Sequence, residues 1–224
     1  MKTLKTFISV SALVTVLAIS AGAHAATISG LYNTGVDNSG VSTIGNGADL
    51  HWQLNDGAAY TGGTNGSFPI GPWVSDSATS RWLTPSPNAS DSFDPDAPGY
   101  YTYSTTFNLT GAQAVDAAFT GQFAADNTVV NILLNGNSLG GGGGFSDWTN
   151  FSATSGDFLS GTNTLDFVVE NYARNGGNPT GLDVQFLSSV AGGVPEPATW
   201  ALSILGVGLT GMALRRAKSQ PVLA

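Results

Sequence analysis

Aromatic residues that stand beside polar ones are the part of this sequence best suited to bind a ligand. Trp148 follows a run of glycines and is adjacent to Asp147, whereas Tyr172 and Arg174 lie just before a Gly-Gly pair. An aromatic ring can cover the apolar face of a sugar, and a few polar groups then fix its orientation. Packing in the core is the alternative, because large aromatic residues are usually buried. The pattern predicts a saccharide site with the candidate residues Trp82, Trp148, Tyr172 and Arg174.

Three carboxylates lie close together at Asp91, Asp94 and Asp96, beside Pro95 and Pro98. Carboxylate oxygens are ligands that calcium prefers. Their spacing does not match the helix-loop-helix calcium motif, and Asp and Pro are also ordinary turn residues. The segment is therefore a candidate calcium site, with a plain turn as the alternative, and no other cofactor is expected.

Groups that could catalyse a reaction are scarce. Between residues 26 and 194 the sequence has one histidine, His51, one glutamate, Glu170, and neither lysine nor cysteine. A serine triad would need His51, which alternates with Leu50 and Trp52 on a predicted strand and is expected to point into solvent. Pairs of Asp carboxylates could hydrolyse glycosides, but the sequence does not show which of them converge. We expect no enzyme, with an Asp-dependent glycoside hydrolase as the alternative.

The charge of the central region excludes one class of partner. Residues 26–194 carry thirteen aspartates and Glu170 against Arg81 and Arg174, a formal net charge of −12. A nucleic-acid-binding protein needs clustered cations to displace counterions from phosphates, so nucleic acid is excluded as a partner. The two arginines are expected to pair with aspartates. The chain has no cysteine, so no disulfide can support the fold.

Alternating apolar and polar residues predict β-strands. The clearest case is residues 101–109, in which Tyr101, Tyr103, Phe107 and Leu109 share one face. Residues 165–169 and 182–186 repeat the pattern, with Asp166 and Asp183 expected to face outward. Such strands, wet on one face, are typical of antiparallel sheets.

Other segments are less regular. Residues 129–134 form an apolar run that ends at Asn135-Gly136, a dipeptide suited to a tight hairpin. The five glycines at 140–144 cost too much backbone entropy for a strand and predict a mobile loop. Weaker strand candidates are residues 28–32, 50–54, 70–74 and 115–123. With about eight strands and no amphipathic helix between the two ends, the sequence predicts an all-β fold, a single antiparallel β-sandwich or jelly roll over residues 26–193.

Both ends of the chain are apolar. Lys2 and Lys5 precede an apolar run at residues 7–19 and the small-residue exit Ala23-His24-Ala25, which predicts a helical signal peptide over residues 1–25. Residues 198–214 carry no charge and are followed by Arg215 and Arg216. Seventeen residues are about the minimum for a transmembrane helix, and the cations favour the cytoplasmic side.

Residues 194–218 resemble the PEP-CTERM sorting signal, in which Pro-Glu-Pro precedes a membrane helix and a basic cluster. The matching residues are Pro195, Glu196, Pro197, Arg215 and Arg216. The resemblance implies recognition and cleavage by an exosortase-type membrane peptidase. The protein would then be exported, held transiently in the inner membrane, and passed to the cell surface or the extracellular matrix. A plain C-terminal anchor is the alternative.

Residues 71–187 are similar to galactose-binding-like jelly rolls. The similarity rests on Ser80-Arg81-Trp82, the strand at 101–109, Asp126-Asn127 before the strand that ends at Asn135-Gly136, and residues 161–165 before the next strand. It implies a fold that hosts many binding roles. We therefore expect a non-catalytic binding module for an exopolysaccharide. A structural surface or matrix protein without a small ligand is the alternative, favoured by the acidic, Gly-rich composition.

Overall fold

The computed structural model describes residues 27–43, 45–62, 68–192, 204–205 and 207–209. The predicted signal peptide and the sorting residues Pro195, Glu196, Pro197, Arg215 and Arg216 lie outside these ranges. The predicted membrane span at 198–214 also lies outside them, except for residues 204–205 and 207–209, which are helical. Within the described ranges, no helix has the length and apolar character needed to cross a bilayer.

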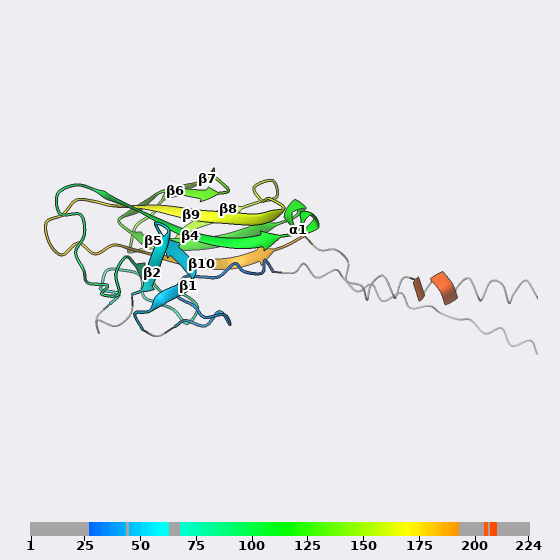
Figure 1. Cartoon of the computed structure of the whole chain (residues 1–224), viewed down its shortest axis with the longest axis horizontal. Helices are drawn as coiled ribbons and strands as arrows, with labels where there is room; N and C mark the ends of the chain where they lie inside the picture. Colours follow the sequence, from blue (N-terminus) through cyan, green and yellow to red (C-terminus); the bar gives the residue numbers. More distant parts are fainter. Residues whose placement is uncertain (1–26, 44, 63–67, 193–203, 206, 210–224) are drawn as a thin grey trace, which may run out of the picture. The chain divides into compact units, whose positions relative to one another are not determined.

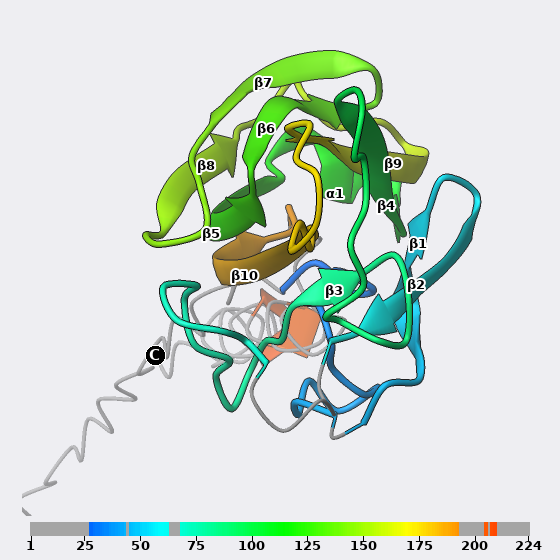
Figure 2. The same cartoon turned by 90° about the vertical axis from the view of Figure 1, so that its left-hand side faces the viewer.

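The compact unit His24–Val194 is mostly β and holds one antiparallel sheet of ten strands that is nearly closed (Figure 1). Along the chain the elements are β1 (Ala48–Leu54), β2 (Gly57–Thr61), β3 (Leu83–Thr84), β4 (Gly99–Leu109), α1 (Gly111–Val115), β5 (Ala118–Asp126), β6 (Thr128–Leu134), β7 (Asn137–Gly142), β8 (Thr149–Ala153), β9 (Gly161–Asn171) and β10 (Gly181–Val190). The order across the sheet is β7-β6-β9-β4-β1-β2-β3-β10-β5-β8. Figure 2 shows the strands curling round a common interior.

Strands β4 and β9 pair along their whole lengths, from Gly99 opposite Asn171 to Leu109 opposite Gly161. The alternation predicted for both strands is confirmed, because Tyr103 and Phe107 on β4 and Phe167 on β9 are buried. Their side chains enter the main core, whose other wall is formed by β5, β8 and β10.

The Phe167 ring lies at the centre of this core. It packs against Phe123 of β5 at a centroid distance of 5.6 Å and against Phe151 of β8 at 5.2 Å. The ring centroid of Trp52 on β1 lies 5.9 Å from that of Phe167. Residues from both sides of the curled sheet therefore meet on one ring, and burial of these large aromatic side chains is the main stabilising contribution expected here.

The hairpin predicted at Asn135-Gly136 is present, with positive φ angles of 54° and 81°. The glycine run after it is not the loop that we predicted, because residues 140–142 belong to β7. The glycines are needed in this strand: a Cβ on Gly141 would lie 2.6 Å from the Val129 carbonyl oxygen, and Gly140 and Gly142 have positive φ. The glycines let the backbone of β7 approach β6 closely and allow the irregular register between the two strands.

Three of the weaker strand predictions need correction. Residues 70–74 form a turn, in which the Trp73 amide donates to the Ile70 carbonyl oxygen at 2.7 Å, because Pro72 has no amide hydrogen for a sheet ladder. The strand predicted at 115–123 begins later than expected, with β5 starting at Ala118, because the chain before it forms the short helix α1 (Gly111–Val115), whose N-terminus is closed by a capping box between Thr110 and Gln113. Residues 28–32 are irregular.

The N-terminal segment, residues 27–43, lies along β10 and covers a carboxylate that we expected to face solvent. Thr34 exchanges hydrogen bonds with Val184: its amide donates to the Val184 carbonyl at 3.1 Å, and its hydroxyl accepts from the Val184 amide at 2.9 Å. The same hydroxyl donates to Asp183 Oδ1 at 3.1 Å. Asp183 is fully buried, so the outward placement predicted from strand alternation is wrong. The segment that covers it lies about 150 positions away in the sequence.

Burial of Asp183 makes the stability of the protein depend on pH. Desolvation raises the pKa of Asp183 to about 7, although hydrogen bonds from Ser80 and Thr34 oppose the shift. The folded protein thus retains a proton that the unfolded chain releases near pH 4, and stability must fall as the pH rises from 4 to 7. Between pH 5 and pH 8 the expected loss from this group is about 3 kcal/mol.

Urea unfolding of the mature protein, followed by Trp fluorescence at pH 5 and pH 8, measures this loss. The Asp183→Asn variant should lose about 3 kcal/mol less than the wild type between the two pH values. Asp147→Asn, which removes an exposed carboxylate, should behave as the wild type. Equal losses in the wild type and Asp183→Asn would show that Asp183 is ionised throughout.

Candidate functional site

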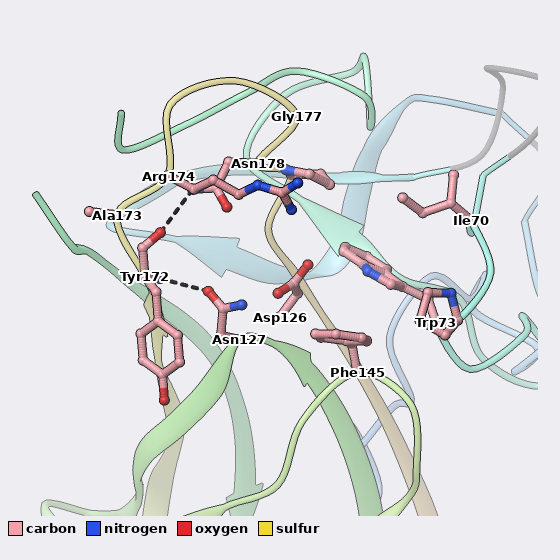
Figure 3. A pocket seen from close by; sticks show the side chains of 12 residues that line it. Ile70, Trp73, Asp126, Asn127, Phe145, Tyr172, Ala173, Arg174, Gly177 and Asn178 are labelled. Atoms are coloured by element: carbon pink, nitrogen blue, oxygen red, sulfur yellow. Dashed lines mark hydrogen bonds between the residues drawn. The ribbon is translucent and has the colours of Figure 1, made fainter. Parts of the chain in front are cut away.

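A cavity of about 370 Å³ opens at the end of the sheet opposite α1 (Figure 3). It lies where β5 ends and β6 begins, beside the loop that joins β9 to β10. Loops that follow Phe68 and β7 complete its wall. The lining residues are Ile70, Pro72, Trp73, Asp126, Asn127, Phe145, Tyr172, Ala173, Arg174, Gly177, Asn178 and Pro179.

Backbone and side-chain hydrogen bonds hold the polar part of this cavity in place. Asn127 sits between β5 and β6, where its amide donates to the Glu170 carbonyl at 3.0 Å. Its side-chain oxygen accepts from the Tyr172 amide at 2.6 Å. Asn178 donates from Nδ2 to the carbonyl of Tyr172 at 2.9 Å and to that of Phe93 at 2.8 Å. The loop after β9 is therefore attached to both neighbouring segments, which orders the groups that it presents.

Aromatic side chains form the opposite wall. The Trp73 ring packs against Trp82 at 4.2 Å and stacks on Phe145 at 6.4 Å with an interplanar angle of 27°. A backbone bond from the Val74 amide to the Phe145 carbonyl, 2.7 Å long, joins the two loops that carry these rings. Trp73 and Trp82 belong to a second apolar cluster, separate from the main core. Packing in this cluster holds the Trp73 ring in position, because Trp82, against which it packs, is itself fully buried.

Asp126 and Arg174 are the charged residues of the cavity. Burial raises the pKa of Asp126 to about 7, whereas a hydrogen bond from the Trp73 side chain and the positive charge of Arg174 act in the opposite direction. Figure 3 shows the Arg174 side chain extending over the cavity on the side away from Phe145, with Asp126 between them. Among the described residues Arg174 closes no ion pair, whereas Arg81 binds Asp76 at 2.9 Å. An acceptor and a cationic donor therefore face the same space.

Two of the four predicted ligand residues line the cavity, namely Tyr172 and Arg174. The Tyr172 side chain is 52 % exposed, and in Figure 3 its ring points away from Asp126, so it forms the rim. Trp148 is half-buried against the second apolar cluster and is not among the lining residues. Trp82 is fully buried, with its indole N–H donating to the Val74 carbonyl at 2.8 Å, so it supports the wall from behind.

The sequence reasoning did not identify Trp73, Asp126, Asn127 and Phe145 as site residues. A usable signal existed for Asp126-Asn127, because polar residues at the junction of two predicted strands lie at an end of the sheet. No comparable signal existed for Trp73 or Phe145, which reach the cavity from two loops about 70 residues apart in the sequence.

Two of the three calcium candidates, Asp91 and Asp94, accept hydrogen bonds from different partners. Asp91 accepts hydrogen bonds from Ser86 at 2.6 Å and from Asn88 at 2.5 Å. Asp94 accepts from Tyr101 and Asn171, at 2.9 Å and 2.7 Å. In the part of the chain that the structure describes, no three His, Cys, Asp or Glu side chains gather in a way that could hold a metal ion. Calcium binding at Asp91, Asp94 and Asp96 stays a prediction.

His51 is also placed differently from our expectation of a solvated side chain. Its ring stacks on Tyr32 at 3.7 Å, and its Nε2 atom is buried without a hydrogen-bond partner among the described residues. Asp49 does not orient the ring as a triad carboxylate would, because Asp49 Oδ1 accepts from the backbone amides of His51 and Trp52. This arrangement therefore differs from the His–Asp pair of a serine triad, in which the carboxylate accepts from the imidazole.

Comparison with known proteins identifies the C-terminal segment. Residues 193–217 match the family model of the PEP-CTERM protein-sorting motif, and all five predicted sorting residues fall inside the match. The motif implies export, processing by an exosortase and membrane-associated sorting to the cell surface. No curated protein matches the chain.

Proposed function

We propose that the sorted protein is a non-catalytic module that binds a polysaccharide of the extracellular matrix through the cavity between Asp126, Arg174 and Trp73. The observation that carries this proposal is the pairing of an aromatic wall with convergent polar groups. Trp73 and Phe145 offer apolar surface, while Asp126, Asn127 and Arg174 offer hydrogen-bonding groups of both kinds. Sugar rings have apolar faces and hydroxyl rims, which match such a cavity.

The carboxylate content of the cavity supports binding without catalysis. Among the lining residues Asp126 is the single carboxylate, and Tyr172 and Arg174 are the other titratable groups. Glycoside hydrolysis ordinarily uses two carboxyl groups on opposite sides of the scissile bond. The cavity therefore has the groups to hold a sugar and lacks the second acid that would cleave it.

We further propose that the domain is a jelly roll. The support is the arrangement of β5, β8 and β10 opposite β4, β6 and β9 across one core, together with the near closure of the sheet. Both features are typical of antiparallel strands folded into two facing layers. In this arrangement the cavity lies in the loops at one end, a common place for ligand sites because a rigid scaffold positions the loops.

Replacing Arg174 by glutamine should weaken polysaccharide binding by about 10- to 100-fold, because a charge-assisted hydrogen bond contributes about 1.5–3 kcal/mol. The Arg174 side chain is exposed and closes no ion pair among the described residues, so the fold should be unaffected. Binding is measured by pull-down and calorimetry with the exopolysaccharide isolated from the producing cells.

Two exposed tyrosines provide a test variant and its matched control. Tyr172 lies at the rim of the cavity, whereas Tyr100 on β4 is not among the lining residues; their exposed fractions are 52 % and 58 %. Tyr172→Ala should weaken binding severalfold, whereas Tyr100→Ala should leave it unchanged. Equal effects of the two substitutions, or an absence of binding by the wild type, would contradict the proposed function and favour a purely structural matrix protein.

A further inference from the structure

We infer that the cavity selects a neutral sugar ring with two neighbouring hydroxyl groups and discriminates against uronic acids. The inference rests on the proposed saccharide function and names the class of sugar that the same site would take. The observation that carries it is that Asp126 and Arg174 both line the cavity, with Trp73 to one side of Asp126.

Neighbouring hydroxyls suit this pair of side chains. Each hydroxyl can both donate and accept, whereas a carboxylate accepts only and a guanidinium donates only. One hydroxyl can therefore donate to Asp126 while the next accepts from Arg174. The Asp126 side chain is 7 % exposed and faces the cavity, so a hydroxyl bound there would be largely removed from competing water. Charge-assisted bonds in such a place are stronger than bonds between neutral groups.

The charge balance of the cavity disfavours an acidic sugar. Arg174 brings one positive charge, and Asp126 brings one negative charge that lies deeper. No further cation lines the cavity, and residues 26–194 have a net charge of −12. A uronate would thus enter a site with no net positive charge inside an acidic domain. The cost of removing its carboxylate from water would not be compensated.

A panel of methyl glycosides tests this selectivity. The full chain, purified in a detergent without a sugar headgroup, is titrated by NMR at pH 8, above the pKa of about 7 of Asp126. The probes are methyl glucoside, galactoside and mannoside, together with the matching methyl glucuronide and galacturonide. We expect the best neutral probe to bind about tenfold more tightly than its uronate. At 0.5 M salt the difference should shrink, because the ions screen the repulsion.

The Asp126→Asn variant separates charge from shape. It leaves Arg174 without its balancing carboxylate, so binding of the uronate should strengthen while binding of the neutral probe weakens. Asp147→Asn changes the net charge of the domain equally, and Asp147 does not line the cavity, so this control should keep the wild-type preference. Thermal melting shows whether both variants are folded. If Asp126→Asn is unfolded, the wild-type titrations still decide whether neutral probes bind more tightly than uronates.

Each result bears on a definite statement. Tighter binding of uronates by the wild type would overturn the inference and leave the saccharide function standing. An absence of binding to every probe and to the isolated exopolysaccharide would overturn the proposed function itself. A neutral preference that Asp126→Asn and Asp147→Asn reduce equally would also overturn the inference, because the selectivity would then come from the whole domain.

Discussion

Replacement of Pro195, Glu196 and Pro197 by alanine should abolish release of the protein from the membrane. These residues lie in the segment that matches the PEP-CTERM sorting motif. Prolines at two of three positions keep a chain out of helical conformation, which leaves its backbone open to a peptidase. With alanines the helix of the predicted span can extend through the segment, since alanine is the best helix former. The uncleaved chain should then accumulate in the inner membrane.

Mass spectrometry of surface and membrane fractions measures this effect in a strain that carries an exosortase. The wild-type surface form should begin near Ala26 and end near the Pro-Glu-Pro segment, without Arg215 and Arg216. The triple variant should be found intact in the membrane fraction. Alanine at Val222 and Leu223, beyond the matched residues, should leave processing normal. A wild-type mature protein that keeps Arg215 and Arg216 would instead identify the tail as a simple anchor.

Truncation of Phe167 to alanine should remove a large part of the stability of the folded domain. The ring is fully buried and contacts aromatic side chains on β1, β5 and β8. Loss of a buried Phe side chain costs about 3–5 kcal/mol through lost transfer free energy and the cavity left behind. Domains are stable by only about 5–15 kcal/mol, and without cysteine no disulfide offsets the loss.

Urea unfolding of the mature protein gives the value, with Val130→Ala on β6 as the control. Val130 is 45 % exposed, so its truncation should change the free energy of unfolding by less than about 1 kcal/mol. A loss below about 1 kcal/mol for Phe167→Ala would show that the two walls of the core do not meet on this ring.

The sequence predicted those elements whose signal is local. The alternation in β4 and β9 was readable because burial on one face imposes a period of two along each strand. The Asn135-Gly136 turn was readable because few dipeptides tolerate two positive φ angles. Residues 28–32 and 70–74 resemble strands in local composition, but neither segment joins the sheet. The Ile28 amide donates to a side chain, the Trp73 amide donates within a turn, and Pro72 has no amide hydrogen.

The candidate site was predicted only in part, for a different reason. Tyr172 and Arg174 stood out because they follow a predicted strand and because Arg174 is one of only two cations in residues 26–194. Trp73, Phe145 and Asp126 come from three separate segments, and no spacing in the sequence shows that they converge. Trp82 and Trp148 have the same chemical character as Trp73, and only packing distinguishes them, since Trp82 is enclosed by Trp73 and its neighbours.

The sequence by itself determined the sorting motif of this protein and its mostly β class, and its charge predicts that nucleic acid is not a partner. These conclusions depend on contiguous patterns or on composition, which tertiary contacts do not alter. The tertiary structure decided which carboxylates are buried and which aromatic residues face a cavity. Asp183 lies on a predicted strand and Asp126 lies between two predicted strands, but a distant segment covers the first and a cavity opens on the second. Burial and convergence are properties of long-range contacts, which a linear pattern does not encode.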